Sequence, residues 1–109
     1  MEHILFIQKV KKDKKDEYIK FHNEAWQELL KEMKNSGIER EMIWIYDNTI
    51  IIYTMAENFD KSYHKLSRTE VFQKWSQIMT PLLISMQDYS KKGNIQKLEK
   101  VFDLEEQIK

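Results

Sequence analysis

The sequence contains no cysteine, only two glycines and only one proline among its 109 residues. The lack of cysteine excludes disulfides and thiolate metal sites. So few glycines and prolines argue against long irregular segments, and two isolated glycines, Gly37 and Gly93, cannot form a glycine-rich phosphate-binding loop. Neither an HExxH zinc motif nor a GxSxG nucleophile motif is present, so the sequence indicates no metal site and no serine hydrolase.

The sequence also lacks an excess of either charge, with 18 basic and 18 acidic residues. Proteins that bind nucleic acid usually carry a basic excess, because neutralising phosphates supplies much of their affinity. We therefore expect no nucleic-acid partner. No apolar run approaches the ~20 residues that span a bilayer, and the first residues do not resemble a signal peptide. We expect a cytoplasmic protein with no membrane partner.

Hydropathy patterns predict a single domain of strands and helices over residues 1–109. An apolar stripe at helical spacing predicts a long first helix, and two β-rich segments on either side of Asp47-Asn48 predict a hairpin. We expect Asp60 to cap a short helix, and a capping box over Ser67–Glu70 to begin another that ends or kinks at Pro81. The expected elements are a strand over 3–10, a helix over 14–35, strands over 41–46 and 49–55, helices over 60–66 and from 67, a loop over 85–95 and a strand over 97–104.

This order, β-α-β-β-α-β, predicts an α+β fold of the ferredoxin-like type, with a four-stranded antiparallel sheet and helices on one face. The segments 42–46 and 50–55 are continuously apolar, whereas a strand with one face in water alternates. The second face of the sheet therefore needs a cover, which another copy of the chain would supply. We expect a homodimer of the dimeric α+β barrel type.

Tyr18 and His22 are the first candidates for chemistry. They lie four residues apart in a predicted helix, so they share one face, which is also the apolar stripe that points toward the sheet. Histidine is the natural acid or base near neutral pH, and a neighbouring tyrosine can bond to a substrate hydroxyl. Taken alone, such a pair is more often a buried structural contact.

Trp75 and Glu41 are further candidates. An indole on the inward stripe of a helix usually fills a core, although its flat face also suits a sugar ring. A carboxylate at the start of a strand is usually exposed, but inside a pocket Glu41 would bind hydroxyls or act as a second acid or base. The other histidines, His3 and His64, do not have the spacing of a metal site.

Two motifs resemble those of the L-rhamnose mutarotase family. Residues 17–29 (EYIKFHNEAWQEL) resemble the family's EYxxxHNxxWxEL signature. Residues 69–80 (TEVFQKWSQIMT) resemble its second motif, T-[DE]-V-x-Q-[RK]-W-W-x-x-M, and residues 98–104 are similar to its closing strand. The resemblance covers nearly the whole chain. It implies a dimeric α+β barrel that interconverts sugar anomers.

The resemblance also implies roles for particular residues. His22 would be the proton donor, Tyr18 a substrate contact and Trp75 a wall of the sugar pocket. Two positions depart from the family pattern, because Ser76 replaces a second tryptophan and Glu41 replaces a substrate-contacting tyrosine. Both changes exchange aromatic surface for polar groups, so we expect these two positions to contact the sugar and to shift the preference away from L-rhamnose.

The sequence therefore predicts a mutarotase that interconverts the α and β anomers of L-rhamnose, or of a related hexose such as L-fucose, by general acid/base catalysis. We expect no cofactor, because opening and closing a sugar ring needs only positioned acids and bases. An alternative left open is a non-catalytic sugar-binding or regulatory module on the same scaffold, and the departures at Glu41 and Ser76 favour it.

Overall fold

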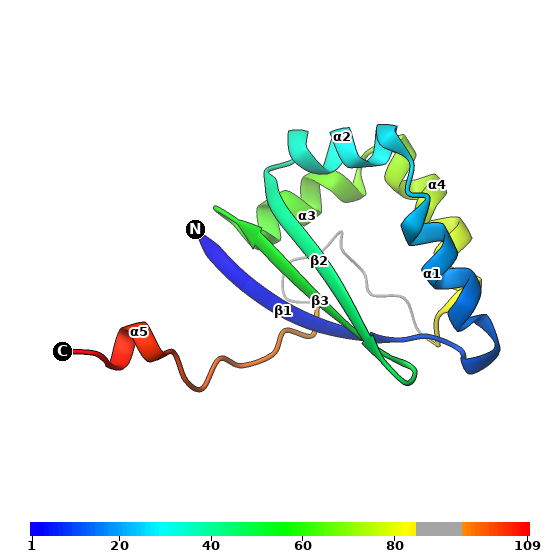
Figure 1. Ribbon diagram of the computed structural model, residues 1–109. Helices are drawn as coiled ribbons and strands as arrows, with labels where there is room; N and C mark the ends of the chain where they lie inside the picture. The colour runs from blue at the N-terminus through cyan, green and yellow to red at the C-terminus, as the bar shows by residue number, and fades with distance from the viewer. Residues whose placement is uncertain (85–94) are drawn as a thin grey trace.

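The computed structural model describes residues 1–84 and 95–109, so the loop expected over 85–95 lies almost wholly outside the described residues. Within these residues, four helices lie on one side of a three-stranded antiparallel sheet (Figure 1). The strands, in the spatial order β1-β3-β2, are β1 (Glu2–Lys9), β2 (Ile38–Tyr46) and β3 (Thr49–Ala56). The helices are α1 (Lys15–Asn23), α2 (Gln27–Asn35), α3 (Phe59–Ser67) and α4 (Glu70–Met79), with a short α5 (Leu104–Gln107) near the C-terminus and 3-10 turns at Lys12–Lys14 and Thr80–Leu82.

Strands β2 and β3 form the predicted hairpin around Asp47-Asn48. Asp47 adopts a positive φ of 54°, which aspartate tolerates better than most residues. In the central strand β3, alternate side chains from Ile50 to Ala56 are buried against the helices, while those between them are half-buried on the other face. The continuous apolar run in this strand therefore reflects contacts on both faces of the sheet.

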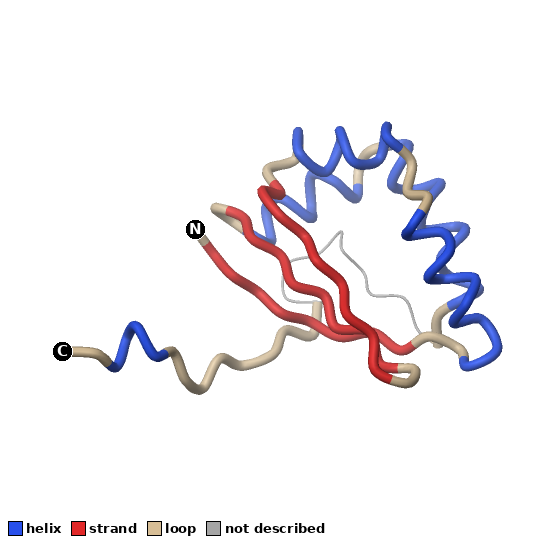
Figure 2. The backbone as a smooth tube through the Cα atoms, viewed as in Figure 1, coloured by secondary structure: helices blue, strands red, loops and turns tan. Residues whose placement is uncertain are grey.

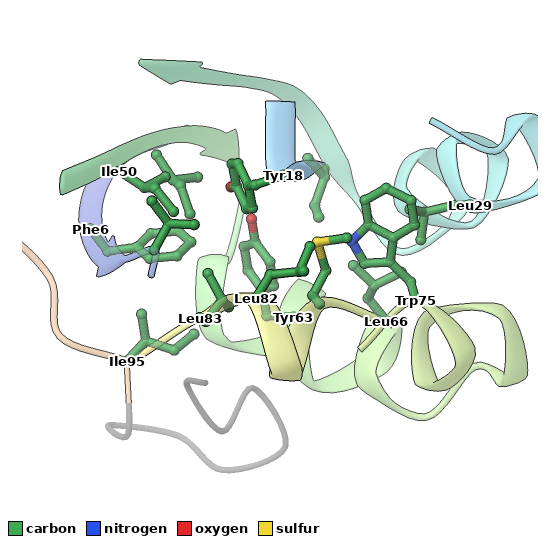
Figure 3. Packing of buried hydrophobic residues seen from close by; sticks show 14 of the residues in the cluster. Phe6, Tyr18, Leu29, Ile50, Tyr63, Leu66, Trp75, Leu82, Leu83 and Ile95 are labelled. Atoms are coloured by element: carbon green, nitrogen blue, oxygen red, sulfur yellow. The ribbon is translucent and has the colours of Figure 1, made fainter. Parts of the chain in front are cut away.

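The core lies between the sheet and the helices (Figure 3). Phe6 at the middle of β1 is fully buried, and its ring packs edge-on against Phe59 and Tyr63 of α3, with centroids 5.6 and 5.9 Å apart. Burying a side chain of this size stabilises a fold by about 1.5–3 kcal/mol. These aromatic contacts fix α3 over the strands and thereby place one wall of the site.

The single helix expected over 14–35 is wrong, because the chain forms two helices with a break between them (Figure 2). Glu24 leaves helical geometry at φ −115° and ψ 34°, and Trp26 is extended, with ψ 131°. The break brings Trp26 edge-on against Trp75, with ring centroids 5.2 Å apart. Apolar periodicity cannot reveal this break, since Ala25 and Trp26 stay half-buried and continue the stripe across it.

Two helices begin at residues other than those predicted. Asn58, rather than Asp60, caps α3, because its side-chain oxygen accepts a backbone N–H at 3.0 Å. Thr69, rather than Ser67, caps α4 through a similar bond of 3.3 Å, and Ser67 is the last residue of α3. Both capping residues have extended backbones, which an N-cap requires. The end of α4 two residues before Pro81 is as predicted.

The strand expected over 97–104 is also wrong for the described chain. Lys97 alone forms a bridge, to Phe6 at the free edge of β1. The chain then leaves the sheet and extends to α5 (Figure 1). Val101 and Phe102 are 85% and 65% exposed. We name residues 98–108 the C-terminal tail.

The sheet face turned away from the helices is apolar. Cross-strand partners form two rows on this face, one centred on Tyr53 and one on Ile51 of β3. Trp44 of β2 is 53% exposed there. We name this surface the outer sheet face, and it consists of Leu5, Ile7, Met42, Trp44, Ile51, Tyr53 and Met55.

Candidate functional site

A pocket lies between the inner face of the sheet and helices α1 to α4. Its volume of about 100 Å³ is several times what one ordered water needs, so it has room for a small ligand. Its walls are mostly apolar, which together with a few convergent polar groups is typical of small-molecule sites. The polar groups in its lining belong to Gln8, Tyr18, His22, Glu41 and Tyr63.

His22 lies in the last turn of α1, one turn after Tyr18. Its Nδ1 is 2.9 Å from the backbone carbonyl oxygen of Tyr18. A carbonyl can only accept, so Nδ1 carries the hydrogen and Nε2 is the nitrogen that exchanges a proton. Burial lowers the pKa of His22 below its ordinary 6.5, more than the bond to the Tyr18 carbonyl raises it. The imidazole is therefore mostly neutral at pH 7.

Aromatic rings hold the imidazole of His22 on two sides. The Tyr18 ring lies 4.1 Å away between centroids, tilted by 33°, and the Trp75 ring meets it nearly edge-on at 5.2 Å. Trp75 is itself packed edge-on against Phe21 and Trp26, so its indole has a fixed orientation in α4. Figure 3 shows Tyr18 and Trp75 among the buried side chains. These contacts fix the plane of the His22 ring.

Tyr18 is 4% exposed and lines the same pocket. Burial raises the pKa of its hydroxyl well above the ordinary 10.0, and the nearby charge of Glu41 raises this pKa further. The Tyr18 hydroxyl therefore keeps its proton at any physiological pH. It can donate a hydrogen bond to a ligand oxygen.

Glu41 lies on the inner face of β2, directly opposite Thr54 of β3. The hydroxyl of Tyr63 donates a hydrogen bond to its Oε1 at 2.6 Å. Withdrawal from water raises the pKa of Glu41 above the ordinary 4.5, more than the Tyr63 hydrogen bond lowers it. Glu41 and His22 thus have pKa values displaced toward each other, a pattern common among acid/base groups at active sites.

The structure brings four of the five predicted site residues together. Tyr18, His22, Glu41 and Trp75 all line the pocket. Ser76 does not lie among the described lining residues, because it follows Trp75 on α4 and a helix turns the next side chain away from the shared face. Ser76 is half-exposed, and its backbone carbonyl accepts the Thr80 hydroxyl at 2.7 Å.

Tyr63 is a site residue that the sequence reasoning missed. It lies at helical spacing from Phe59 and Leu66, and this spacing does signal a side chain that faces inward. Its contact with Glu41, however, joins residues 22 positions apart through the packing of α3 on the sheet. No local pattern reports such a contact.

Among the described residues we find neither a metal site nor a membrane-spanning helix. In residues 1–84 and 95–109, no three histidine or acidic side chains gather closely enough to hold a metal ion. Among the helices of the same residues, none is long and apolar enough to cross a membrane.

A family model described as L-rhamnose mutarotase matches residues 3–104. The chain belongs to the L-rhamnose mutarotase family. It is 35% identical over 86 residues to the L-rhamnose mutarotase of Oceanobacillus iheyensis, a match that covers 78% of this chain and 83% of that protein. The match to the L-rhamnose mutarotase of Shouchella clausii is 33% identical and covers 77% and 82% of the two chains. The family resemblance of the two sequence motifs is confirmed.

Two solved structures have a similar fold. One is the L-rhamnose mutarotase of Formosa agariphila, with a TM-score of 0.74, 24% identity, and coverage of 95% of this chain and 99% of that one. The other is tetracenomycin F2 cyclase of Streptomyces glaucescens, with a TM-score of 0.62, 16% identity, and coverage of 94% and 96%. At these identities the likeness shows the fold alone. The predicted ferredoxin-like α+β class is confirmed.

Proposed function

We propose that the protein is a mutarotase that interconverts the α and β anomers of L-rhamnose, or of a related hexose such as L-fucose. The observation that carries the proposal is the pocket that both the imidazole of His22 and the carboxyl group of Glu41 line. Membership of the L-rhamnose mutarotase family supports the same conclusion. The pocket supplies the two proton-transfer groups that the reaction needs.

Mutarotation is a paired proton transfer. One group takes the proton of the anomeric hydroxyl while another donates a proton to the ring oxygen, and the C1–O5 bond breaks to give the open-chain aldehyde. After rotation about C1–C2, the reverse transfers close the ring on the other face of the carbonyl. Positioned acids and bases typically contribute on the order of 10²–10⁴-fold each.

We assign proton donation to Nε2 of His22 in its imidazolium form, which is the minor form at pH 7, and acceptance of the anomeric proton to Glu41. The two groups then hold one exchangeable proton between them. Burial lowers the pKa of His22, so its protonated form is a stronger acid than a free imidazolium. Burial raises the pKa of Glu41, so its carboxylate is a stronger base than a free one. Tyr18, which keeps its proton, would donate a hydrogen bond to the sugar, and Trp75 would pack against the ring.

The lining of the pocket bears on which sugar is bound. Apolar side chains such as Leu29, Met33 and Ile43 suit the methyl group of a 6-deoxy sugar. Glu41 adds a polar group, whereas Ser76 lies outside the described lining, so only one of the two family departures bears directly on the pocket. We expect measurable exchange with both L-rhamnose and L-fucose. The test is to measure anomer exchange with L-rhamnose, L-fucose and unmodified hexoses. If only L-rhamnose exchanges faster, the expected shift in sugar preference is contradicted.

Saturation transfer by NMR tests the activity. Irradiating one anomer signal reduces the other in proportion to their exchange rate, which we expect the protein to increase. His22→Ala should lose at least 100-fold of that acceleration while keeping its circular dichroism spectrum, and His64→Ala, on the exposed side of α3, is the matched control. Full activity of His22→Ala would refute the assignment. A sugar that binds without faster exchange would instead indicate a non-catalytic binding module.

We propose that the functional unit is a cytoplasmic homodimer formed through the outer sheet face. The support is the apolar character of that face, where Trp44 is 53% exposed, and of the C-terminal tail, where Val101 and Phe102 are exposed. Burying such side chains against a second copy would stabilise the pair at about 25 cal/mol per Å² of apolar surface. Light scattering after size exclusion should give twice the monomer mass, and Trp44→Glu should shift the protein toward monomer. A monomeric wild type at micromolar concentration would refute the dimer.

A further inference from the structure

Tyr63 belongs to neither of the two sequence motifs, yet its hydroxyl contacts the carboxyl group of the site. The residue lies on α3, is 2% exposed and lines the pocket. The 2.6 Å separation from Oε1 of Glu41 lies within the range of a charge-assisted hydrogen bond between a hydroxyl and a carboxylate. Such bonds are roughly twice as strong as those between neutral groups, so this contact joins the phenol to the acid beyond simple packing.

The contact extends to a third residue. Thr54 is fully buried on β3, directly across from Glu41 in the register of the two strands. Its Oγ1 lies 2.9 Å from the Tyr63 hydroxyl, so this hydroxyl bridges the two strand residues. An ionised carboxylate can only accept, which makes Tyr63 the donor to Glu41 and the acceptor of the Thr54 hydroxyl. The chain of bonds therefore runs in one direction, from Thr54 through Tyr63 to Glu41.

We infer that Tyr63 is a positioning residue for Glu41: supported by Thr54, it holds the carboxyl group in place and favours its ionised form. The inference rests on the proposed function, because it gives the carboxylate the task of accepting the anomeric proton. The Tyr63 bond occupies Oε1. A carboxylate offers about four lone-pair sites, so acceptor capacity remains for a sugar hydroxyl.

The surroundings of Glu41 make this hydrogen bond important. The titratable groups that line the pocket with it are Tyr18 and His22 of α1 and Tyr63 of α3, and the described lining contains no lysine or arginine. Removal from water raises the pKa of Glu41, and the Tyr63 hydroxyl opposes that rise. With no lysine or arginine in the described lining and with His22 mostly neutral at pH 7, the hydroxyl is a main support of the carboxylate.

Titration of the carboxyl carbon tests the inference without reference to activity. Protein labelled with ¹³C at glutamate carboxyls is titrated by NMR, and Glu41→Gln identifies the signal of Glu41. The titration midpoint should move to higher pH in Tyr63→Phe, and by less in the same direction in Thr54→Val. Tyr46→Phe removes the same hydroxyl from a tyrosine that is 81% exposed, and should leave the midpoint unchanged. An unchanged midpoint in folded Tyr63→Phe overturns the inference.

Exchange kinetics then connect the residue to the reaction. We expect Tyr63→Phe to lose about tenfold of the acceleration at pH 7, the order of one hydrogen bond to a charged group, and to lose more at pH 5. A uniform loss at every pH would indicate a merely structural role and would overturn the inference. If the wild type does not accelerate exchange but the midpoint of Tyr63→Phe still moves, the proposed function fails while the positioning of Glu41 by Tyr63 stands.

Discussion

Replacing Glu41 by glutamine should make the protein more stable at pH 8 while reducing its activity. The carboxyl group lies in a pocket with mostly apolar walls, and burial raises its pKa above the ordinary 4.5. In the wild type, the Tyr63 hydroxyl lies 2.6 Å from Oε1 of Glu41. The carbonyl oxygen of a glutamine at this position can still accept the same hydrogen bond. The substitution therefore removes the charge of a half-buried carboxyl group and keeps the hydrogen bond from Tyr63.

The sign of the pH dependence follows from the direction of the shift. A carboxyl group whose pKa is raised by folding lowers the free energy of unfolding as the pH rises from its ordinary pKa through its folded one. Wild type and Glu41→Gln should thus be similarly stable at pH 4 and differ at pH 8. We expect about 1 kcal/mol, the lower end of the cost of burying a polar group, because Glu41 is half-buried and keeps one hydrogen bond. The lowered pKa of His22 makes the free energy of unfolding fall toward acid pH in both proteins. This contribution therefore cancels when wild type and Glu41→Gln are compared.

Urea unfolding followed by tryptophan fluorescence measures this difference, because Trp75 is buried beside Trp26 in the core. In thermal unfolding, about 1 kcal/mol corresponds to about 4 °C for a domain of this size. Glu39→Gln, at an exposed position of the same strand, is the control and should change stability by less than about 0.5 kcal/mol. A Glu41→Gln protein that is less stable than wild type at pH 8, or equally shifted at both pH values, would refute the reasoning.

Three further predictions concern the reaction and the fold. The pH profile of kcat/KM should be bell-shaped, because the reaction needs one proton shared between His22 and Glu41. Its alkaline limb should lie below pH 6.5, the ordinary pKa of histidine, because burial lowers the pKa of His22. A profile that is flat from pH 5 to 8 would count against this prediction. Gly37→Ala should lower the free energy of unfolding by about 1–3 kcal/mol. Gly37 has a φ of 105°, and a Cβ at this position would lie 2.7 Å from the Ser62 hydroxyl. Unchanged urea unfolding would contradict this prediction. Asn58→Ala should cost about 1 kcal/mol through loss of the α3 cap, measured in the same way, and a cost near zero would show that the cap is dispensable.

Local sequence patterns were sufficient to predict the hairpin. They also predicted which face of the first helical segment carries the candidate site residues. Asp47-Asn48 interrupts two β-rich segments, and the Tyr18–His22 spacing places both side chains on the apolar stripe. Both features depend on residues a few positions apart, where backbone geometry leaves few alternatives. The family motifs then suggested the roles that we propose for His22 and Trp75, which spacing alone leaves open.

Features that depend on distant contacts were not predictable in this way. The break before Trp26 is compensated by its contact with Trp75, a residue 49 positions later in the printed sequence. The bond between Glu41 and Tyr63 likewise arises from the packing of a helix on a strand. The segment 97–104 has the apolar alternation of a strand, but in the described chain it forms only the bridge of Lys97 to Phe6, with one backbone bond from Leu98 to Leu5. Alternating hydropathy indicates that a segment favours the extended conformation, whereas strand pairing also requires a neighbouring strand in the fold.

The break between α1 and α2 also assigns two parts of the pocket lining to separate helices. The helix before it carries His22, and the helix after it carries the apolar wall formed by Leu29, Leu30 and Met33. In one continuous helix, a change that rotated the wall would rotate the imidazole as well. Because the extended Trp26 separates the two helices, we expect substitutions in α2 to change the pocket wall without altering the helix that carries His22. Libraries confined to α2 are therefore the place to seek new sugar preferences without loss of chemistry.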